Sequence, residues 1–156
     1  MFLGTLFDFD EEENILSYSK IGIQNQINKF QYAVIKGLKE NNLHRIDVIN
    51  VEPVGTYPKH YNKLFLKSKN WLLDSNIKSK QLGSINIPIL KQLSRRLKAE
   101  SEIKNWLKSN INADSKHIII YGLYLPYLKA IKRVSDDIKI TAIVTDLPEF
   151  DELSSS

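Results

Sequence analysis

The sequence has no cysteine and only three histidines in 156 residues. Without cysteine there is no disulfide bond, no thiolate nucleophile and no cysteine-ligated metal. His44, His60 and His117 are far apart in the chain, so no transition-metal site is predicted. The phosphate-binding motifs G-x-G-x-x-G and G-x-x-x-x-G-K-[ST] are also missing, and apolar runs stay short of the roughly 20 residues that span a bilayer. We expect neither a metal nor another cofactor.

The composition is that of a folded domain, with 42% hydrophobic and 26% charged residues. The amino terminus is apolar and then acidic, whereas a signal peptide begins with basic residues, so we expect an intracellular protein. The net charge is +4, and basic residues are concentrated between Lys59 and Lys98. A basic region of this kind suits an anionic surface, a phosphate or a nucleic acid, and it equally suits a solvated face without a partner.

Strands and helices are predicted to alternate along the chain. The five predicted strands are Met1–Phe7, Ile46–Val51, Lys80–Ile87, His117–Tyr121 and Ile138–Thr145. Alternation of this kind predicts an α/β fold: a Rossmann-like, mainly parallel sheet of about five strands with helices on both faces. A single domain over residues 1–156 is expected.

The strand predicted over Ile138–Thr145 is the one around which the site is organised. Its residues are mostly apolar and β-branched on both faces, which is typical of an interior strand covered by helices on both sides. Polar residues follow at once, so the strand delivers Asp146 and Glu149 to its carboxyl end. In open α/β sheets this is the edge at which ligands bind.

Apolar periodicity predicts the helices. The first begins at Gln24 or Asn25 and ends at Asn41-Asn42, and its inward stripe is Ile23, Ile27, Phe30, Val34 and Leu38. A second helix begins at Pro88, with inward Leu90, Leu93 and Leu97 and outward Lys91, Arg95, Arg96 and Lys98.

The rest of the chain is predicted to hold two more helices and an acidic loop. The second helix is expected to bend or break near Ala99–Ser101, and a third helix covers Leu123–Ser135. A further helix is predicted over Asn62–Leu73. The segment Asp8–Asn14 is predicted as a loop, because five of its residues are carboxylates that repel one another.

Polar groups gather where the predicted strands end. They include Thr5, Glu52, Gly55, Thr56, Tyr57, Tyr121, Tyr124, Thr145, Asp146 and Glu149. Hydroxyl, amide and carboxylate groups of this kind recognise sugars and other polyols by hydrogen bonds. Asp146 is the candidate general base, and it is equally well accounted for as a cap on the turn that follows it.

A second candidate surface is a segment in which basic and aromatic residues interleave. The basic residues are Lys59, Lys63 and Lys67, and Trp71 is the last of the aromatic ones. This mixture suits the surface of an anionic membrane. It is also compatible with aromatic rings that pack in the core beside solvated lysines, and with binding of single-stranded nucleic acid, which we rank last. We expect no nucleic-acid partner.

Four segments, in order, carry a resemblance to a known family. They are Gly4-Thr5-Leu6-Phe7; Asn28-Lys29-Phe30-Gln31 with Lys36-Gly37-Leu38; Pro53-Val54-Gly55-Thr56-Tyr57-Pro58; and Ile143-Val144-Thr145-Asp146-Leu147-Pro148-Glu149-Phe150. With this order and spacing, the chain resembles the amino-terminal half of bacterial glycosyltransferases of the two-domain GT-B type, the group 1 family that uses nucleotide sugars.

The resemblance implies a function in the synthesis of cell-surface polysaccharides or glycoconjugates. In this family the amino-terminal domain holds the acceptor, a sugar or a lipid-linked sugar, and the carboxy-terminal domain holds the donor. The donor domain and its Glu-x7-Glu motif are absent here, so the resemblance implies a truncated chain or half of a split enzyme, inactive alone. It also implies a cytoplasmic location, with the option of attachment to the inner face of the membrane.

By the same resemblance, a defined set of residues lines the acceptor side. The set is Asn28, Lys29, Gly55, Thr56, Tyr57, Asp146 and Glu149. Two alternatives stay open. A flavodoxin-like nucleotide-binding module shares the alternating pattern, although the acidic segment Asp8–Glu13 would repel phosphate. A non-catalytic module would bind a membrane surface or a protein partner through its basic face.

Overall fold

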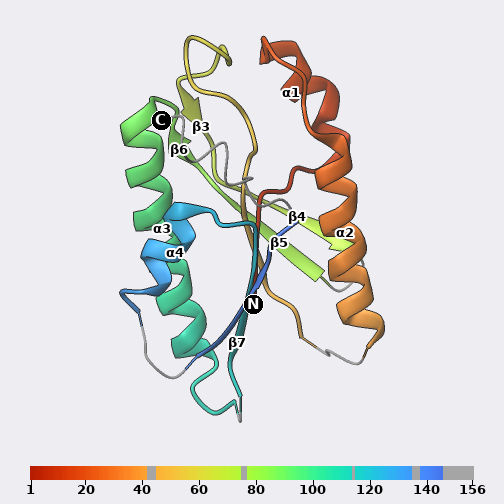
Figure 1. The fold of residues 1–156 in the computed structure, drawn as a ribbon, viewed down its shortest axis with the longest axis vertical. Helices are drawn as coiled ribbons and strands as arrows, with labels where there is room; N and C mark the ends of the chain where they lie inside the picture. The colour runs from red at the N-terminus through yellow and green to blue at the C-terminus, as the bar shows by residue number, and fades with distance from the viewer. Residues whose placement is uncertain (42–44, 75–76, 114, 135–137, 146–156) are drawn as a thin grey trace, which may run out of the picture.

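The computed structural model describes residues 1–41, 45–74, 77–113, 115–134 and 138–145. Its centre is a six-stranded sheet in the order β4-β5-β2-β1-β7-β8. The sheet lies between two layers of helices (Figure 1). The strands are β1 (Phe2–Gly4), β2 (Val48–Val51), β4 (Lys69–Asp74), β5 (Ile77–Leu82), β7 (His117–Tyr121) and β8 (Lys139–Ile143). A short antiparallel pair is formed by β3 (Phe65–Leu66) and β6 (Ser84–Ile85).

Five strands of the sheet are parallel, and each overlaps one of the five predicted strands. Along the sheet their chain order is third, second, first, fourth, fifth, which is compatible with a Rossmann-like fold. The sixth strand, β4, pairs antiparallel with β5 at one edge. The predicted class, a mixed α/β fold with a mainly parallel sheet, is therefore confirmed, with six strands in place of about five.

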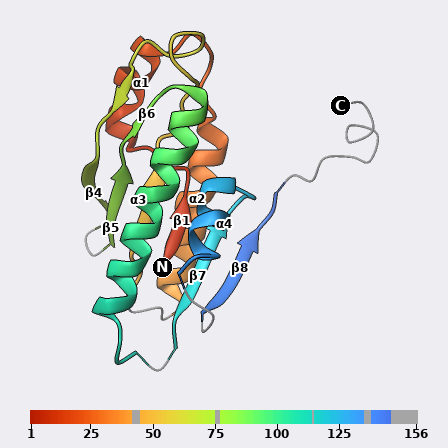
Figure 2. The ribbon, with the colours of Figure 1, turned by 90° about the vertical axis from the view of Figure 1, so that its left-hand side faces the viewer.

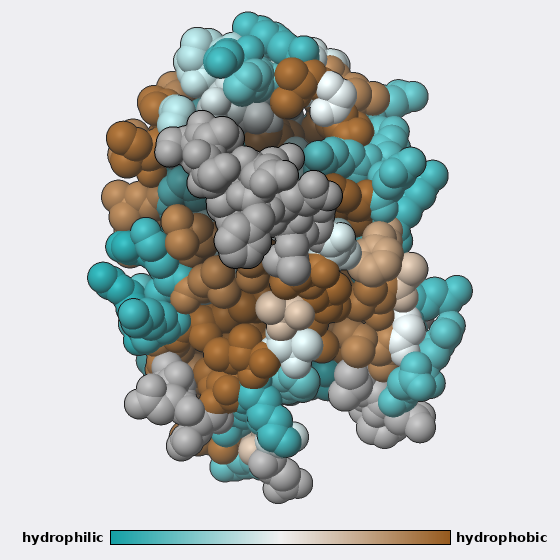
Figure 3. All heavy atoms as spheres, viewed as in Figure 1, coloured by the Kyte–Doolittle hydropathy of each residue, from teal (hydrophilic) through white to brown (hydrophobic). Residues whose placement is uncertain are grey.

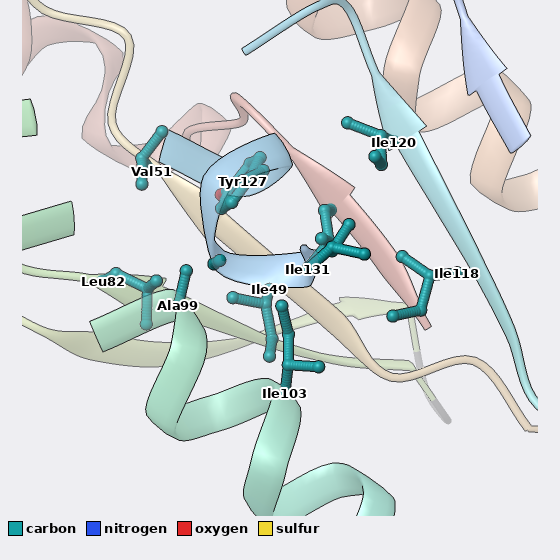
Figure 4. Close-up of a cluster of buried hydrophobic side chains, with 11 residues drawn as sticks. Ile49, Val51, Leu82, Ala99, Ile103, Ile118, Ile120, Tyr127 and Ile131 are labelled. Carbon is teal, nitrogen blue, oxygen red and sulfur yellow. The ribbon is translucent and has the colours of Figure 1, made fainter. Parts of the chain in front are cut away.

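Helices cover both faces of this sheet, as predicted. One face packs against α2 (Asn25–Glu40), and the other packs against α3 (Pro88–Ser109) and α4 (Leu125–Ile131) (Figures 1 and 2). In the core under α3 and α4, Ile49 of β2 lies among Ile103 and Tyr127 of the two helices (Figure 4). The two strands β1 and β2 lie between the helical layers and are buried along their whole length, which accounts for their mostly apolar sequences.

The bounds predicted for α2 are correct, but its predicted inward face is wrong in part. The helix begins after Gln24 and ends before Asn41. Phe30 is 45% exposed, whereas the side chains of Asn28 and Gln31 are buried. Apolar periodicity cannot identify this face, because the buried positions are occupied by amides with backbone partners.

The face predicted for α3 is also wrong. Pro88 begins the helix as predicted, but the helix runs without interruption through Ala99. Lys91 and Arg95, predicted to face outward, are buried, while Leu93 is 41% exposed. The two buried cations are accommodated because their charged ends meet hydrogen-bond acceptors at the end of β2.

Two segments differ from their predicted structure. The acidic segment predicted as a loop forms a 3-10 turn (Phe9–Glu11) and α1 (Glu12–Tyr18). Carboxylates are favourable in the first turn of a helix, where the amide dipoles are positive. The helix predicted over Asn62–Leu73 is replaced by β3 and β4, whose alternating exposed and partly buried residues have the period of a strand.

The strand predicted to lie inside the sheet is at its edge. Within the described residues, β8 pairs only with β7, and Ile140 is 50% exposed. Its β-branched composition correctly predicted a strand, but composition does not determine the number of neighbours. Asp146 and Glu149 lie outside the described residues.

Candidate functional site

The candidate site lies at the carboxyl edge of the parallel strands, near the boundary between β1 and β7. The order of the strands reverses there, because the chain leaves β1 through α2 on one face and enters β7 from α3 on the other. Reversal of this kind separates the two following loops and opens a crevice in which α/β proteins bind ligands. The loops concerned follow β1, β2 and β7.

Two buried amides of α2 hold the loop that follows β1. Asn28 Oδ1 accepts a hydrogen bond from the Phe7 N–H (3.0 Å), and its Nδ2 donates to the Phe7 carbonyl (3.0 Å). Gln31 accepts from the Thr5 N–H (2.9 Å) and donates to the Thr5 carbonyl (3.1 Å). Asn28, predicted to bind the acceptor, therefore uses its side chain to shape the loop.

Replacing Asn28 with leucine is expected to lower the free energy of unfolding by about 2 kcal/mol. The Phe7 N–H would lose its partner, whereas the Phe7 carbonyl would keep the Tyr32 hydroxyl, which lies 3.2 Å away. Urea denaturation measures the change, and Gln26→Leu on the exposed face of the same helix is the control. Equal stability of Asn28→Leu and the wild type would show that these bonds contribute little.

Arg95 joins three segments at the same edge. Its Nη2 donates to the Glu52 carbonyl (2.6 Å), its Nη1 to the Tyr124 hydroxyl (2.9 Å) and its Nε to Ser84 Oγ (3.3 Å). Only 3% of Arg95 is exposed. The planar guanidinium can serve three acceptors in a fixed arrangement, so Arg95 fixes the ends of β2 and β6 and the loop after β7 relative to one another.

Lys91 lies one helical turn before Arg95 and holds the loop that follows Glu52. Its Nζ donates to the carbonyls of Val54 (2.5 Å) and Gly55 (3.2 Å). Burial and the nearby positive charge of Arg95 lower the pKa of Lys91 from 10.5 to about 7, and Glu52 opposes this shift. Near neutral pH, Lys91 therefore exchanges between its charged and neutral forms.

The carboxylate of Glu52 lies near the cations Lys91 and Arg95 of α3 and also near Lys63 and Lys69. Glu52 directly follows β2 and is 7% exposed, and its side chain makes no hydrogen bond within the described part of the chain. Burial raises its pKa above the usual 4.5, while Lys69, Arg95 and Lys63 act in the opposite direction. A buried carboxyl without a partner is available to accept a hydrogen bond, or a proton, from a ligand.

Two tyrosines close this arrangement toward β1. The Tyr127 hydroxyl donates to the Gly4 carbonyl (2.8 Å), and its ring packs edge-on against Tyr124, with centroids 5.1 Å apart. A side chain at Gly4 would collide with Gln31, since an added Cβ would lie 2.7 Å from Gln31 Oε1. The end of β1 is therefore tightly enclosed between α2 and α4.

Gly55, Thr56 and Tyr57 form one turn beside Glu52. The Thr56 carbonyl accepts from the N–H of His60 (2.8 Å), and the Tyr57 N–H donates to the Asn86 carbonyl (2.8 Å). Gly55 has no room for a side chain, because an added Cβ would lie 2.3 Å from the Cβ of His60. Tyr57 is 37% exposed and precedes a cis proline.

The structure thus brings together three of the seven predicted acceptor residues in this turn. The side-chain amide of Asn28 is occupied by the Phe7 backbone, and Lys29 is exposed near the start of α2. Asp146 and Glu149 are beyond the described residues. The sequence prediction placed Glu52 at this edge but gave it no role, and it did not include Lys91 and Arg95 in the site. Lys91, Arg95 and the buried Ala99 follow one another at four-residue steps and so lie on one face of α3, and this spacing could have identified them.

The residues predicted to face a membrane do not share one environment. Lys59 and Lys67 are exposed, but Lys63 Nζ lies 3.6 Å from the centre of the Tyr18 ring. Trp71 packs in the cluster under α2, and its indole N–H donates to the Tyr32 hydroxyl (3.4 Å). The tryptophan is therefore engaged in packing, unlike the two exposed lysines.

A separate groove of about 620 Å³ opens toward the amino end of the strands, between α3 and β5. The carboxylates of this groove already have partners: Glu102 pairs with Lys80 (2.6 Å), and Asp47 pairs with Arg45 (3.4 Å) and accepts from the Trp106 indole N–H (3.0 Å). Because these carboxylates are already paired, we favour the carboxyl edge, where the Glu52 carboxylate has no partner among the described residues.

Comparison with known proteins gives no significant match to a protein-family model, a curated protein or a solved structure. Within the described ranges, no helix is both long and apolar enough to cross a bilayer, and no three acidic or histidine side chains group as metal ligands do. The class that fold and site define is a mixed α/β protein, compatible with a Rossmann-like fold, with a polar cluster at the carboxyl edge of its sheet.

Proposed function

We propose that this chain is the acceptor-binding domain of a nucleotide-sugar-dependent glycosyltransferase of the GT-B type. The observation that carries the proposal is the buried carboxylate of Glu52, without a hydrogen-bond partner in the described structure, beside the turn of Gly55, Thr56 and Tyr57. A sugar hydroxyl is the kind of group that such a carboxylate binds, and Thr56 and Tyr57, further along the same loop, add two side-chain hydroxyls. In this proposal the acceptor is a sugar or a lipid-linked sugar.

The residues around Glu52 have different roles in this proposal. Lys91 and Arg95 hold the backbone of the Glu52–Gly55 loop, so the carboxylate is fixed before the acceptor arrives. The raised pKa of Glu52 makes it a stronger base than an exposed glutamate, suited to take the proton of an attacking hydroxyl. The donor sugar is assigned to a second domain or a partner subunit, so the chain by itself is expected to bind the acceptor without transferring a sugar.

Glu52→Gln is expected to weaken binding of the acceptor at least about tenfold, since the amide keeps the shape but loses the charge. Saturation-transfer NMR on the 156-residue chain with a panel of hexose disaccharides measures binding. Glu102→Gln, in the separate groove near the amino end of the strands, is the matched control. Failure of every disaccharide to bind, or equal binding by Glu52→Gln, would refute the role of Glu52.

The same substitution is expected to stabilise the protein at pH 7 by on the order of 1 kcal/mol, because it removes a buried unpaired charge. The folded pKa of Glu52 lies above 4.5, so the stability that this group contributes is fully present below pH 4.5 and is lost as pH rises through the folded pKa. The gain from Glu52→Gln should therefore disappear below pH 4.5. Urea denaturation at pH 4 and pH 7 tests this, and a gain that persists at pH 4 would contradict it.

A further inference from the structure

The outer side of α3 and the adjoining side of α4 form an exposed apolar surface, here called the α3–α4 surface. Its apolar residues are Ile89 (81% exposed), Leu93 (41%), Leu97 (50%) and Leu125 (53%). Ile89, Leu93 and Leu125 line one hollow of about 200 Å³ between the helices, together with Arg96 and Lys129. Figure 3 shows hydrophobic residues along its left-hand margin, over α3.

The charge of this surface is mainly positive, with one carboxylate, that of Glu100, near Arg96. The sequence has no aspartate or glutamate from Ile77 to Ala99, nor from Ser115 to Val134, which covers the first three turns of α3 and all of α4. The nearest carboxylate along α3, that of Glu100, is bonded to Lys104 (2.6 Å). The aliphatic side chains are therefore bordered by two cations in the hollow, Arg96 and Lys129.

We infer that the α3–α4 surface docks on an anionic lipid bilayer. Leucine and isoleucine side chains insert at the boundary between headgroups and acyl chains, while lysine and arginine bind the phosphates around them. A second copy of this chain fits the surface less well, because a symmetric contact would bring its cations together. The surface differs from the predicted basic and aromatic segment, whose Trp71 packs under α2.

This inference does not depend on the proposed acceptor-binding function. It is tested by sedimenting the 156-residue protein with vesicles of phosphatidylcholine alone and with vesicles that contain about 30% phosphatidylglycerol, at low salt. The wild type should sediment only with the anionic vesicles. The double variant Ile89→Ser/Leu125→Ser should lose about tenfold in partitioning, and Arg96→Glu/Lys129→Glu should lose at least roughly 25-fold, at roughly fivefold for each of the two cations lost.

Matched controls separate this surface from the rest of the molecule. Ile111→Ser removes an isoleucine that is 73% exposed elsewhere, and Lys59→Glu/Lys67→Glu reverses two lysines of the basic and aromatic segment. Both should sediment like the wild type, and all variants should unfold at the wild-type temperature. The inference is overturned by a wild type that binds no anionic vesicle, by a loss confined to Lys59→Glu/Lys67→Glu, or by a dimer in light scattering that Ile89→Ser/Leu125→Ser dissociates.

Discussion

Replacing Arg95 with alanine should lower the free energy of unfolding by about 3 kcal/mol. The substitution removes hydrogen bonds to the Glu52 carbonyl and to the hydroxyls of Tyr124 and Ser84, all inside the protein. It also removes the positive charge that partly offsets the burial of the Glu52 carboxylate. Urea denaturation followed by the fluorescence of the two tryptophans measures the loss.

Two further variants identify the cause of that loss. Arg95→Lys keeps the charge but not the planar arrangement of donors, so it should recover less than half of the stability. Lys98→Ala, at an exposed position of the same helix, should change stability by less than about 0.5 kcal/mol. If Arg95→Ala unfolds at the urea concentration of the wild type, the three-way bonding of Arg95 is not a stabilising feature.

The stability of the wild type relative to Lys91→Met should increase by up to about 4 kcal/mol between pH 7 and pH 10.5, at roughly 1.36 kcal/mol per pKa unit. Burial beside Arg95 lowers the pKa of Lys91 from 10.5 to about 7. Between these values the unfolded chain holds the Lys91 proton and the folded chain does not, so the free energy of unfolding rises with pH. Below pH 7 the folded protein must bury the ammonium ion, and this contribution is lost.

The comparison with Lys91→Met removes the effects of other groups. Burial raises the pKa of Tyr127, so ionisation of this tyrosine in the unfolded chain lowers stability above pH 10 in both proteins. Urea denaturation at four pH values between 6 and 10 gives the difference directly. Lys20→Met, on an exposed lysine, should follow the wild-type profile. Parallel profiles for the wild type and Lys91→Met would show that Lys91 is not destabilised in its charged form.

Both predictions concern residues that the apolar pattern assigned to the wrong side of α3. The leucines of this helix indicated one face, yet Lys91 and Arg95 are buried and Leu93 is exposed. Arginine and lysine are rarely buried without partners, so a sequence rule places them outside. Their backbone partners are carbonyls just after the end of β2, far earlier in the chain. Only the folded chain brings donor and acceptor together.

The candidate site, too, was predicted from the sequence only in part. The segment of Gly55, Thr56 and Tyr57 was expected near the carboxyl edge because it follows a predicted strand, and the structure places it there. The absence of any partner for the Glu52 carboxylate among the described residues was not predictable, because it depends on which side chains from α3 and β4 approach it. Likewise, the amide of Asn28 is occupied by Phe7, across a turn and a helix that the sequence did not indicate.

The sequence by itself determined that five parallel strands exist, although the third is Ile77–Leu82 and not Lys80–Ile87, together with the bounds of α2 and the beginning of α3. These depend on local properties: β-branched apolar runs, helical periodicity and proline at a first turn. The tertiary structure alone decided that β8 lies at an edge, that the segment before β5 forms a strand, and that two cations of α3 are buried. Each of these outcomes depends on contacts between distant segments, whose hydrogen bonds and packing outweigh local preferences of a few tenths of a kcal/mol per residue.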